Sequence, residues 1–211
     1  MTGLGDILAK GGLAIWVIGL LSVLTVALIL WKLWRLWLAG TWSGGAATNQ
    51  AIDAWESGDT SAALTLLRGR ASLRARLAHA AMSAHLSDSF DDPDAREETT
   101  RVAKRLLAEA RRGLRALDLI ATIAPLLGLL GTVMGMISAF QALQVAGTSA
   151  DPATLAGGIW EALLTTAAGM AVAIPASMAH VWFEAQVDRV QADMEDAATR
   201  IFTRAPVSAE G

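Results

Sequence analysis

The long apolar stretches of this sequence contain several polar side chains, among them Thr132, Glu161, Thr165 and Thr166. Placing an ionisable group in a bilayer costs about 2.5–3.5 kcal/mol, which makes Glu161 a candidate functional residue. Hydroxyl groups donate and accept hydrogen bonds, so they can bond a carboxyl group in either protonation state, or a water that relays a proton. These residue types therefore allow proton transfer within a membrane. The alternative is that each hydroxyl bonds a carbonyl oxygen one turn earlier in its own helix.

Small and hydroxyl side chains recur at helical spacing around these positions. They are Pro125, Gly128, Thr132, Gly135 and Ala139 in the first stretch, and Ala162, Thr166, Gly169, Ala173 and Ser177 in the second. Each set shares one helix face, and small residues gain nothing against lipid, so both faces should meet other helices or a lumen. Glu161 and Thr165 share a face, whereas Thr166 lies about 140° from Glu161. The residues alone leave packing and lumen lining both open.

Three motifs follow one another along these stretches: GLLGTVMG at residues 128–135, GIWEALLTTAAG at 158–169 and AIPA at 173–176. Together they resemble the signature region of the MotA/TolQ/ExbB proton-channel family, over roughly residues 114–183. The ExbB branch is the most similar, and TolQ is close behind. The resemblance implies that Thr132, Thr166 and Glu161 line a proton pathway, in which Thr165 is a further candidate. We assign helix packing to the remaining motif residues Gly128, Gly131, Gly135, Gly169 and Pro175.

The resemblance also implies a machine with several subunits. Five copies of this chain would surround helices of a single-span ExbD/TolR-like partner, which brings the titrating aspartate. The motor would act through a TonB- or TolA-like protein from the inner membrane of a Gram-negative cell. This reading makes the chain a motor subunit for TonB-dependent transport and not an enzyme. The alternatives are a TolQ-like subunit of the Tol-Pal envelope system and a scaffold that conducts no ions. A MotA role is less favoured because that branch has four spans.

Three apolar stretches are long enough to cross a bilayer, which takes about 20 helical residues. We therefore expect an all-α membrane protein with three transmembrane helices, long cytoplasmic helical extensions, an outer N-terminus and a homo-oligomeric, pentameric ring. The expected spans are residues 13–31, 117–142 and 157–183. The segments 1–12 and 143–156 are expected on the outer side, and 32–116 and 184–211 in the cytoplasm.

This orientation follows from the positive-inside rule. Thirteen of the 17 Lys and Arg residues lie between the first and second spans, and three follow the third. The connection at 143–154 has none. Tryptophans gather near the expected membrane surfaces: Trp16 and Trp160 on the outer side, and Trp31, Trp34, Trp37 and Trp182 on the inner side.

Helix-start signals predict helices in the expected cytoplasmic region. A helix should begin at Asp59 or Thr60, and another at Asp92 with Pro93 in its first position. Nothing obvious interrupts the latter before the membrane, so we expect one long helix, and the tail should continue helically from the third span. There is no cysteine, and the three histidines lack ligand spacing, which predicts no metal and no cofactor. Basic residues without interleaved aromatic side chains argue against nucleic-acid binding.

Overall fold

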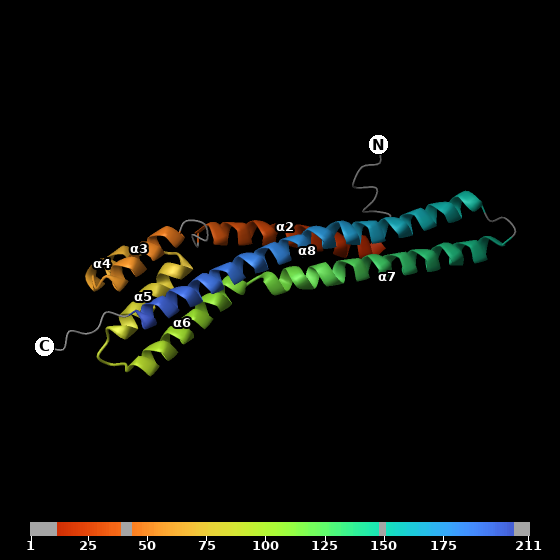
Figure 1. Cartoon of the computed structure of the whole chain (residues 1–211). Coiled ribbons are helices and arrows are strands. Elements are labelled where there is room, and N and C mark those ends of the chain that lie inside the picture. The colour runs from red at the N-terminus through yellow and green to blue at the C-terminus, as the bar shows by residue number, and fades with distance from the viewer. Residues whose placement is uncertain (1–11, 39–43, 148–150, 205–211) are drawn as a thin grey trace. The chain divides into compact units, whose positions relative to one another are not determined.

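The computed structural model describes residues 12–38, 44–147 and 151–204, and the secondary structure of these residues is helical. The helices are α2 (Gly12–Leu38), α3 (Gly44–Glu56), α4 (Thr60–Leu67), α5 (Leu73–His85), α6 (Asp92–Arg111), α7 (Leu114–Ala146) and α8 (Pro152–Thr203) (Figure 1). They form two compact units. One unit holds the described residues up to Leu30 and from Gly113 to Val181, and the other holds the rest.

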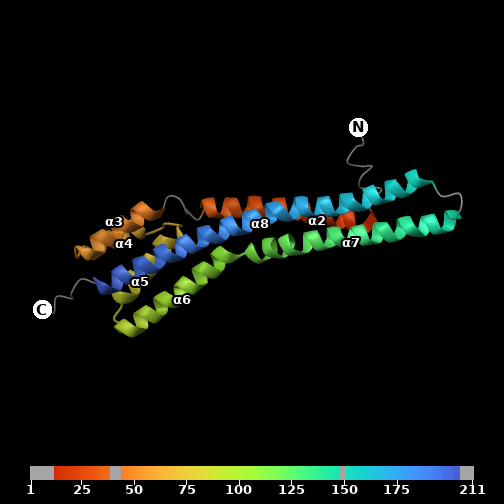
Figure 2. The same cartoon turned by 45° about the vertical axis from the view of Figure 1, so that its right-hand side comes forward.

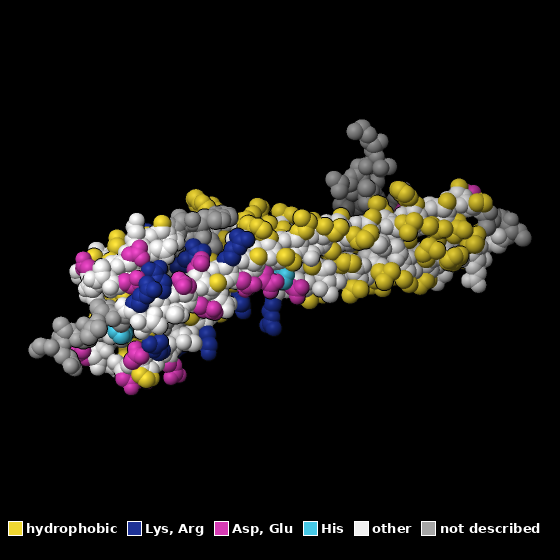
Figure 3. Space-filling view, viewed as in Figure 1, with side chains coloured by type: hydrophobic (Ala, Val, Ile, Leu, Met, Phe, Trp, Pro, Cys, Tyr) yellow, Lys and Arg dark blue, Asp and Glu magenta, His cyan; other side chains and the backbone are white. Residues whose placement is uncertain are grey.

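Three helical stretches are long and apolar enough to cross a membrane: Ala14–Trp37, Asp92–Ala146, which comprises α6 and α7, and Pro152–Thr203. The prediction of an all-helical protein with three such stretches is confirmed. Hydrophobic side chains cover the visible face of the first unit, whereas charged side chains gather on the second (Figure 3). Large apolar side chains such as Leu126, Leu129 and Ile174 are more than half exposed in the single chain. Such a surface requires lipid or other subunits.

In the first unit, α7 and α8 run side by side in opposite directions, and α2 lies along them (Figures 1 and 2). Their core joins residues of all three helices: Ile18 of α2, Ile120 and Ala124 of α7, and Val172, Ala173 and Ala176 of α8. Three of these six core residues are alanines, whose small side chains let the helix backbones approach closely.

The second unit packs α3, α4, α5 and α6 with the end of α8 around Trp55. The Trp55 side chain is fully buried, and its indole Nε1 donates to the Ile201 carbonyl oxygen at 3.1 Å. Met82 and Phe202 belong to the same core. The hydrogen bond satisfies the one polar atom of a large apolar side chain, so the tryptophan fixes the last turn of α8 in this core.

The expectation of one long helix from Asp92 into the membrane is wrong. Helix α6 ends at Arg111, and Gly113 takes φ 85°, a left-handed conformation that interrupts the helix before α7 begins at Leu114. Glycine reaches this region without the steric cost that a Cβ would bring. Asp59 caps α4 as predicted, by accepting from the Ala62 N–H. Asp91 caps α6, so Pro93 is its second residue, and α8 continues unbroken to Thr203.

Candidate functional site: the α7–α8 contact

The backbones of α7 and α8 touch where their glycines lie. A Cβ added to Gly169 would lie 2.5 Å from the Ala124 carbonyl oxygen, and one added to Gly128 would lie 2.9 Å from Thr165 O and Thr166 Cα. Further along, an added Cβ at Gly135 would lie 2.8 Å from the Ala162 Cβ. Real Cβ atoms do not approach backbone this closely, so these positions require glycine. The small residues of the two helices therefore face each other.

Thr165 is buried in this contact, with 3% of its surface exposed. Its hydroxyl lies 2.7 Å from the Ala162 carbonyl oxygen of its own helix and 3.1 Å from the Gly128 carbonyl oxygen of α7. The single hydroxyl proton is shared between these two acceptors. Thr165 thus connects the two helices, and its side chain does not point to an open surface.

Helix α2 covers one side of the α7–α8 pair. A Cβ added to Gly131 would lie 2.6 Å from Thr165 Oγ1 and 3.2 Å from the Ala14 Cβ of α2. Gly131 and Thr165 therefore lie at the same level and mark the side that α2 covers.

Thr132 and Thr166 are turned away from the side that Gly131 and Thr165 mark. Thr132 follows Gly131 by one position, and Thr166 follows Thr165 by one position, which is a rotation of about 100° around each helix. Because Gly131 and Thr165 lie at the same level, the two threonines lie at a similar level too.

The two hydroxyls differ in their hydrogen bonds. Thr132 is half-buried, and its Oγ1 donates to the Leu129 carbonyl oxygen at 2.7 Å, in the local manner that the sequence left open. Thr166 is also half-buried, and its Oγ1 is buried without a hydrogen-bond partner among the described residues. A buried hydroxyl without a partner is costly and calls for an explanation. Thr166 can donate and accept without first breaking another bond.

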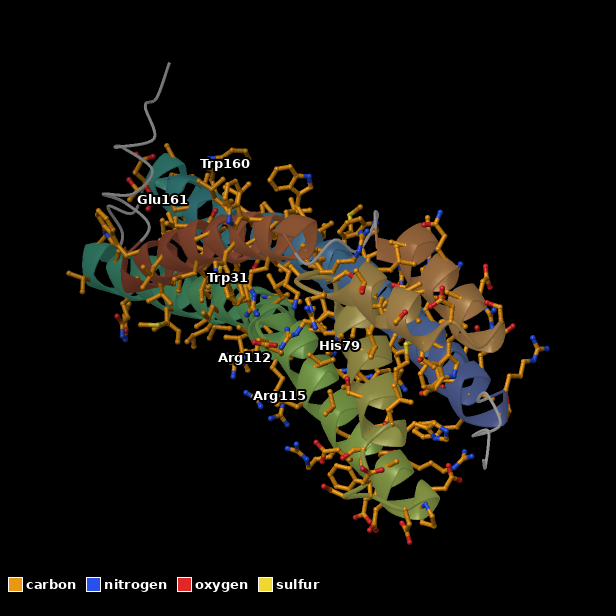
Figure 4. The ribbon with its side chains drawn as sticks, turned by 90° about the vertical axis from the view of Figure 1, so that its left-hand side faces the viewer. Trp31, His79, Arg112, Arg115, Trp160 and Glu161 are labelled. Atoms are coloured by element: carbon orange, nitrogen blue, oxygen red, sulfur yellow. The ribbon has the colours of Figure 1, made fainter. Side chains whose placement is uncertain are left out.

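Glu161 lies on α8 beside the exposed Trp160 (Figure 4) and is half-buried. It precedes Thr165 by four residues, so it lies on the Thr165 side of α8 and is not brought together with Thr132 and Thr166. Pro175 lies inside α8 and is exposed in the single chain. In the described ranges, no three His, Asp or Glu side chains cluster as a metal site would require.

Sequence reasoning missed the role of Lys32, which entered only as an orientation signal. Its side chain is 3% exposed, and its ammonium group donates to the carbonyl oxygens of Ala110 and Arg112. These are unpaired carbonyls at the negative end of α6, where a cation is favourable. A lysine so close to an apolar span was the available signal, but its partners lie almost 80 residues away in the sequence.

Residues 70–196 match the family model described as the MotA/TolQ/ExbB proton channel family, which covers more than half of the 211 residues. The chain belongs to this family. It is a multi-pass membrane protein, and the family's members are channel subunits and not enzymes.

Named relatives within the family point mainly to ExbB. The chain is 35% identical to the biopolymer transport protein ExbB of Salmonella typhimurium, over 62% of this chain and 55% of the relative. It is 45% identical to the biopolymer transport protein exbB1 of Vibrio cholerae, over 39% of this chain and 36% of the relative. It is 43% identical to the Tol-Pal system protein TolQ of Haemophilus influenzae, over 35% of this chain and 32% of the relative. The chain thus spans between about a third and about half the length of these relatives. ExbB-like relatives also occur in a cyanobacterium and an archaeon, so family membership does not specify the type of cell.

Proposed function

We propose that this chain is an ExbB-like motor subunit driven by the proton-motive force. Together with a single-span ExbD-like partner it energises TonB-dependent transport across the outer membrane of a Gram-negative bacterium. The observation that supports this proposal is the close contact of α7 and α8, which brings Thr132 and Thr166 to a similar level. We propose that both hydroxyl side chains face the same side of the α7–α8 pair, away from α2.

We propose that five copies of the chain form the ring that the family resemblance implies. In a ring in which α2 lies outermost, the side of the α7–α8 pair opposite α2 faces the centre, and five such sides enclose a lumen lined by ten threonines. The large apolar side chains exposed in the single chain would then meet lipid or neighbouring copies. The positive-inside rule supports an outer N-terminus and a cytoplasmic second unit.

The mechanism divides the chemistry between two proteins. The one aspartate within the expected spans, Asp118, lies at the inner edge of the second span, so we propose that the titrating acid at mid-membrane belongs to the partner helix in the lumen. A charged aspartate is stabilised beside hydroxyls and water, whereas a protonated one can pass apolar surface. In this proposal the Thr166 hydroxyl, which is buried and unpartnered in the single chain, turns toward the lumen to take part in this exchange. Each proton that crosses about 100 mV releases about 2.3 kcal/mol, which alternate charging would convert into rotation.

Thr165 and Glu161 take different parts in this proposal. Thr165 holds α7 and α8 in their close contact, which fixes the positions of Thr132 and Thr166. Glu161 lies about one and a half turns nearer the outer side than Thr166. Its place on the other side of α8 makes it an entrance residue and not a partner of the two hydroxyls.

The test is proton flux into liposomes that contain the full chain with and without an ExbD-like partner. We expect flux only with the partner, and none with Thr132→Val or Thr166→Val although the complex still assembles. Ser138→Val is a matched control, because Ser138 is an exposed hydroxyl residue of α7 that lies about 120° around the helix from Thr132. Wild-type flux in both threonine variants, or assembly without flux in the wild type, would refute the motor function and favour a scaffold.

A TolQ-like role is the second candidate, supported by the similarity to TolQ of Haemophilus influenzae. Both roles use the same proton pathway, so flux does not separate them. Deletion of the gene does: loss of TonB-dependent uptake supports the ExbB-like role, whereas detergent sensitivity of the envelope supports the TolQ-like role. Replacing the proton gradient by a sodium gradient in the same liposomes identifies the ion.

A further inference from the structure

A small cavity of about 200 Å³ lies inside the second unit, between the last turns of α2, the start of α5 and the end of α6. Its charged lining consists of Lys32, Arg35, Arg76 and Glu109, and its apolar lining includes Leu36 and Leu73. None of these residues belongs to the α7–α8 contact. The cavity is smaller than the 300–1,000 Å³ of a typical small-molecule site, so it suits one compact group.

The lining carries more positive than negative charge. Its one acid, Glu109, is shared by two arginines, at 3.9 Å from Arg35 and 3.5 Å from Arg76. Both distances exceed the 2.7–2.9 Å of a charge-assisted hydrogen bond. Each guanidinium has five N–H donors, so the carboxylate leaves most of them available to a second anion.

Lys32 adds to this excess of charge. Two protons of its ammonium group are donated to the carbonyl oxygens of Ala110 and Arg112, which neutralises the negative end of α6. The ammonium group has a third proton, and Lys32 lines the cavity. The first turn of α5 lies at the cavity too, and the positive end of that helix favours an anion.

The surroundings of the cavity indicate which anion it meets. Trp31, Trp34 and Trp37 are exposed by 42%, 61% and 65% on the same turns of α2 (Figure 4 labels Trp31). The Arg35 guanidinium lies 5.2 Å from the centre of the Trp31 ring. Exposed tryptophans and basic side chains at the end of an apolar helix are typical of the headgroup level of a bilayer. Basic pockets at this level bind phosphate-bearing headgroups.

We infer that this cavity binds the phosphate group of an anionic phospholipid, with the acyl chains lying along α2 outside it. Arg35 and Arg76 hold the phosphate oxygens, Lys32 adds its remaining donor, and Glu109 competes with the lipid for the two arginines. The bound lipid would join the end of α2 to the starts and ends of α5 and α6. The inference rests on the membrane placement of the chain and not on its proton pathway.

The test is native mass spectrometry of the full chain in detergent, titrated with phosphatidylglycerol, with phosphatidylcholine and with inorganic phosphate. We expect phosphatidylglycerol to bind in preference to phosphatidylcholine and to resist displacement by inorganic phosphate. The double variant Arg35→Gln with Arg76→Gln removes both arginines. It should weaken the binding of phosphatidylglycerol by about fivefold for each arginine. Glu109→Gln should strengthen the binding of phosphatidylglycerol, because this variant lacks the carboxylate that competes for the two arginines.

The matched control is Arg105→Gln with Arg112→Gln, which removes the same charge from exposed side chains outside the cavity (Figure 4 labels Arg112). The control should change lipid binding by less than about twofold. Equal losses in both double variants, or weaker binding in Glu109→Gln, would overturn the inference. Displacement of the lipid by inorganic phosphate would show a free-anion site instead. If the double variant does not fold, the sign of the Glu109→Gln change still decides. Failure here would leave the proton flux of the proposed motor unaffected.

Discussion

The Thr165 hydroxyl of α8 lies 3.1 Å from the Gly128 carbonyl oxygen of α7. This hydrogen bond sits in the tightly packed part of the α7–α8 contact, where Gly128 leaves no room for a side chain. It fixes the rotation of α8 about its own axis, and therefore the direction in which the adjacent Thr166 points. Two neighbouring threonines thus have separable roles, one in packing and one at the proposed lumen.

Thr165→Val should lower stability by about 1 kcal/mol, because valine keeps the shape but removes the hydrogen bond between helices. Thr166→Val should leave stability unchanged or slightly higher, because its buried hydroxyl has no partner to lose. The measurement is the midpoint of thermal unfolding in detergent. Thr165→Ser, which restores a hydroxyl, is the control. Equal midpoints for Thr165→Val and the wild type would contradict the packing role.

Gly169→Ala should destabilise the α7–α8 contact by about 1–3 kcal/mol, because its Cβ would meet the Ala124 carbonyl oxygen at 2.5 Å. Gly157→Ala on the same helix is the matched control, since nothing lies within 4 Å of its added Cβ. Both changes replace a glycine of α8 by alanine and so raise helix propensity. The difference between their unfolding midpoints therefore reports the destabilisation that the Cβ of Gly169→Ala causes by steric overlap. A Gly169→Ala protein as stable as the Gly157→Ala protein would show that the helices can separate freely.

Lys32→Met should destabilise the second unit by about 1.5–3 kcal/mol, because the change removes two hydrogen bonds from a charged donor to the end of α6. Lys104→Met removes the same charge from an exposed position of α6 and should be nearly neutral. Hydrogen exchange at residues 108–112 is the measurement. Protection there that survives Lys32→Met would argue against the capping role.

Lowering the pH should weaken the contact between the end of α8 and α3. Arg200 donates to Glu56 and Asp53, each at 2.8 Å, and its hydrogen bond holds the pKa of Glu56 below the usual value. A lowered folded-state pKa stabilises the folded state above the unfolded pKa, near 4.3 for glutamate, and that stabilisation is lost as the pH falls through the folded pKa.

The fall in unfolding midpoint between pH 6 and pH 3 should therefore be smaller in Glu56→Gln than in the wild type. The control is Glu97→Gln, which removes one carboxylate from an exposed position of α6. An identical pH dependence of Glu56→Gln and the wild type would exclude Glu56 as a source of acid sensitivity.

The sequence by itself determined the class of protein. Three apolar stretches cannot remain in water, and the motifs around Thr132 and Thr166 carry the resemblance that the family match supports. Helical periodicity also predicted the small-residue faces of the second and third apolar stretches. These features are local, because length, hydropathy and spacing depend on residues that are close together in the sequence.

Only the tertiary structure separated Thr165 from Thr166, because their roles depend on which side of the α7–α8 pair α2 covers. Periodicity gives the angle between two side chains on one helix but not the rotation of that helix against its neighbours. The break at Gly113 was missed for a related reason, since glycine is tolerated both inside and between helices. The cap that Lys32 places on α6 joins segments almost 80 residues apart, and packing alone brings them together.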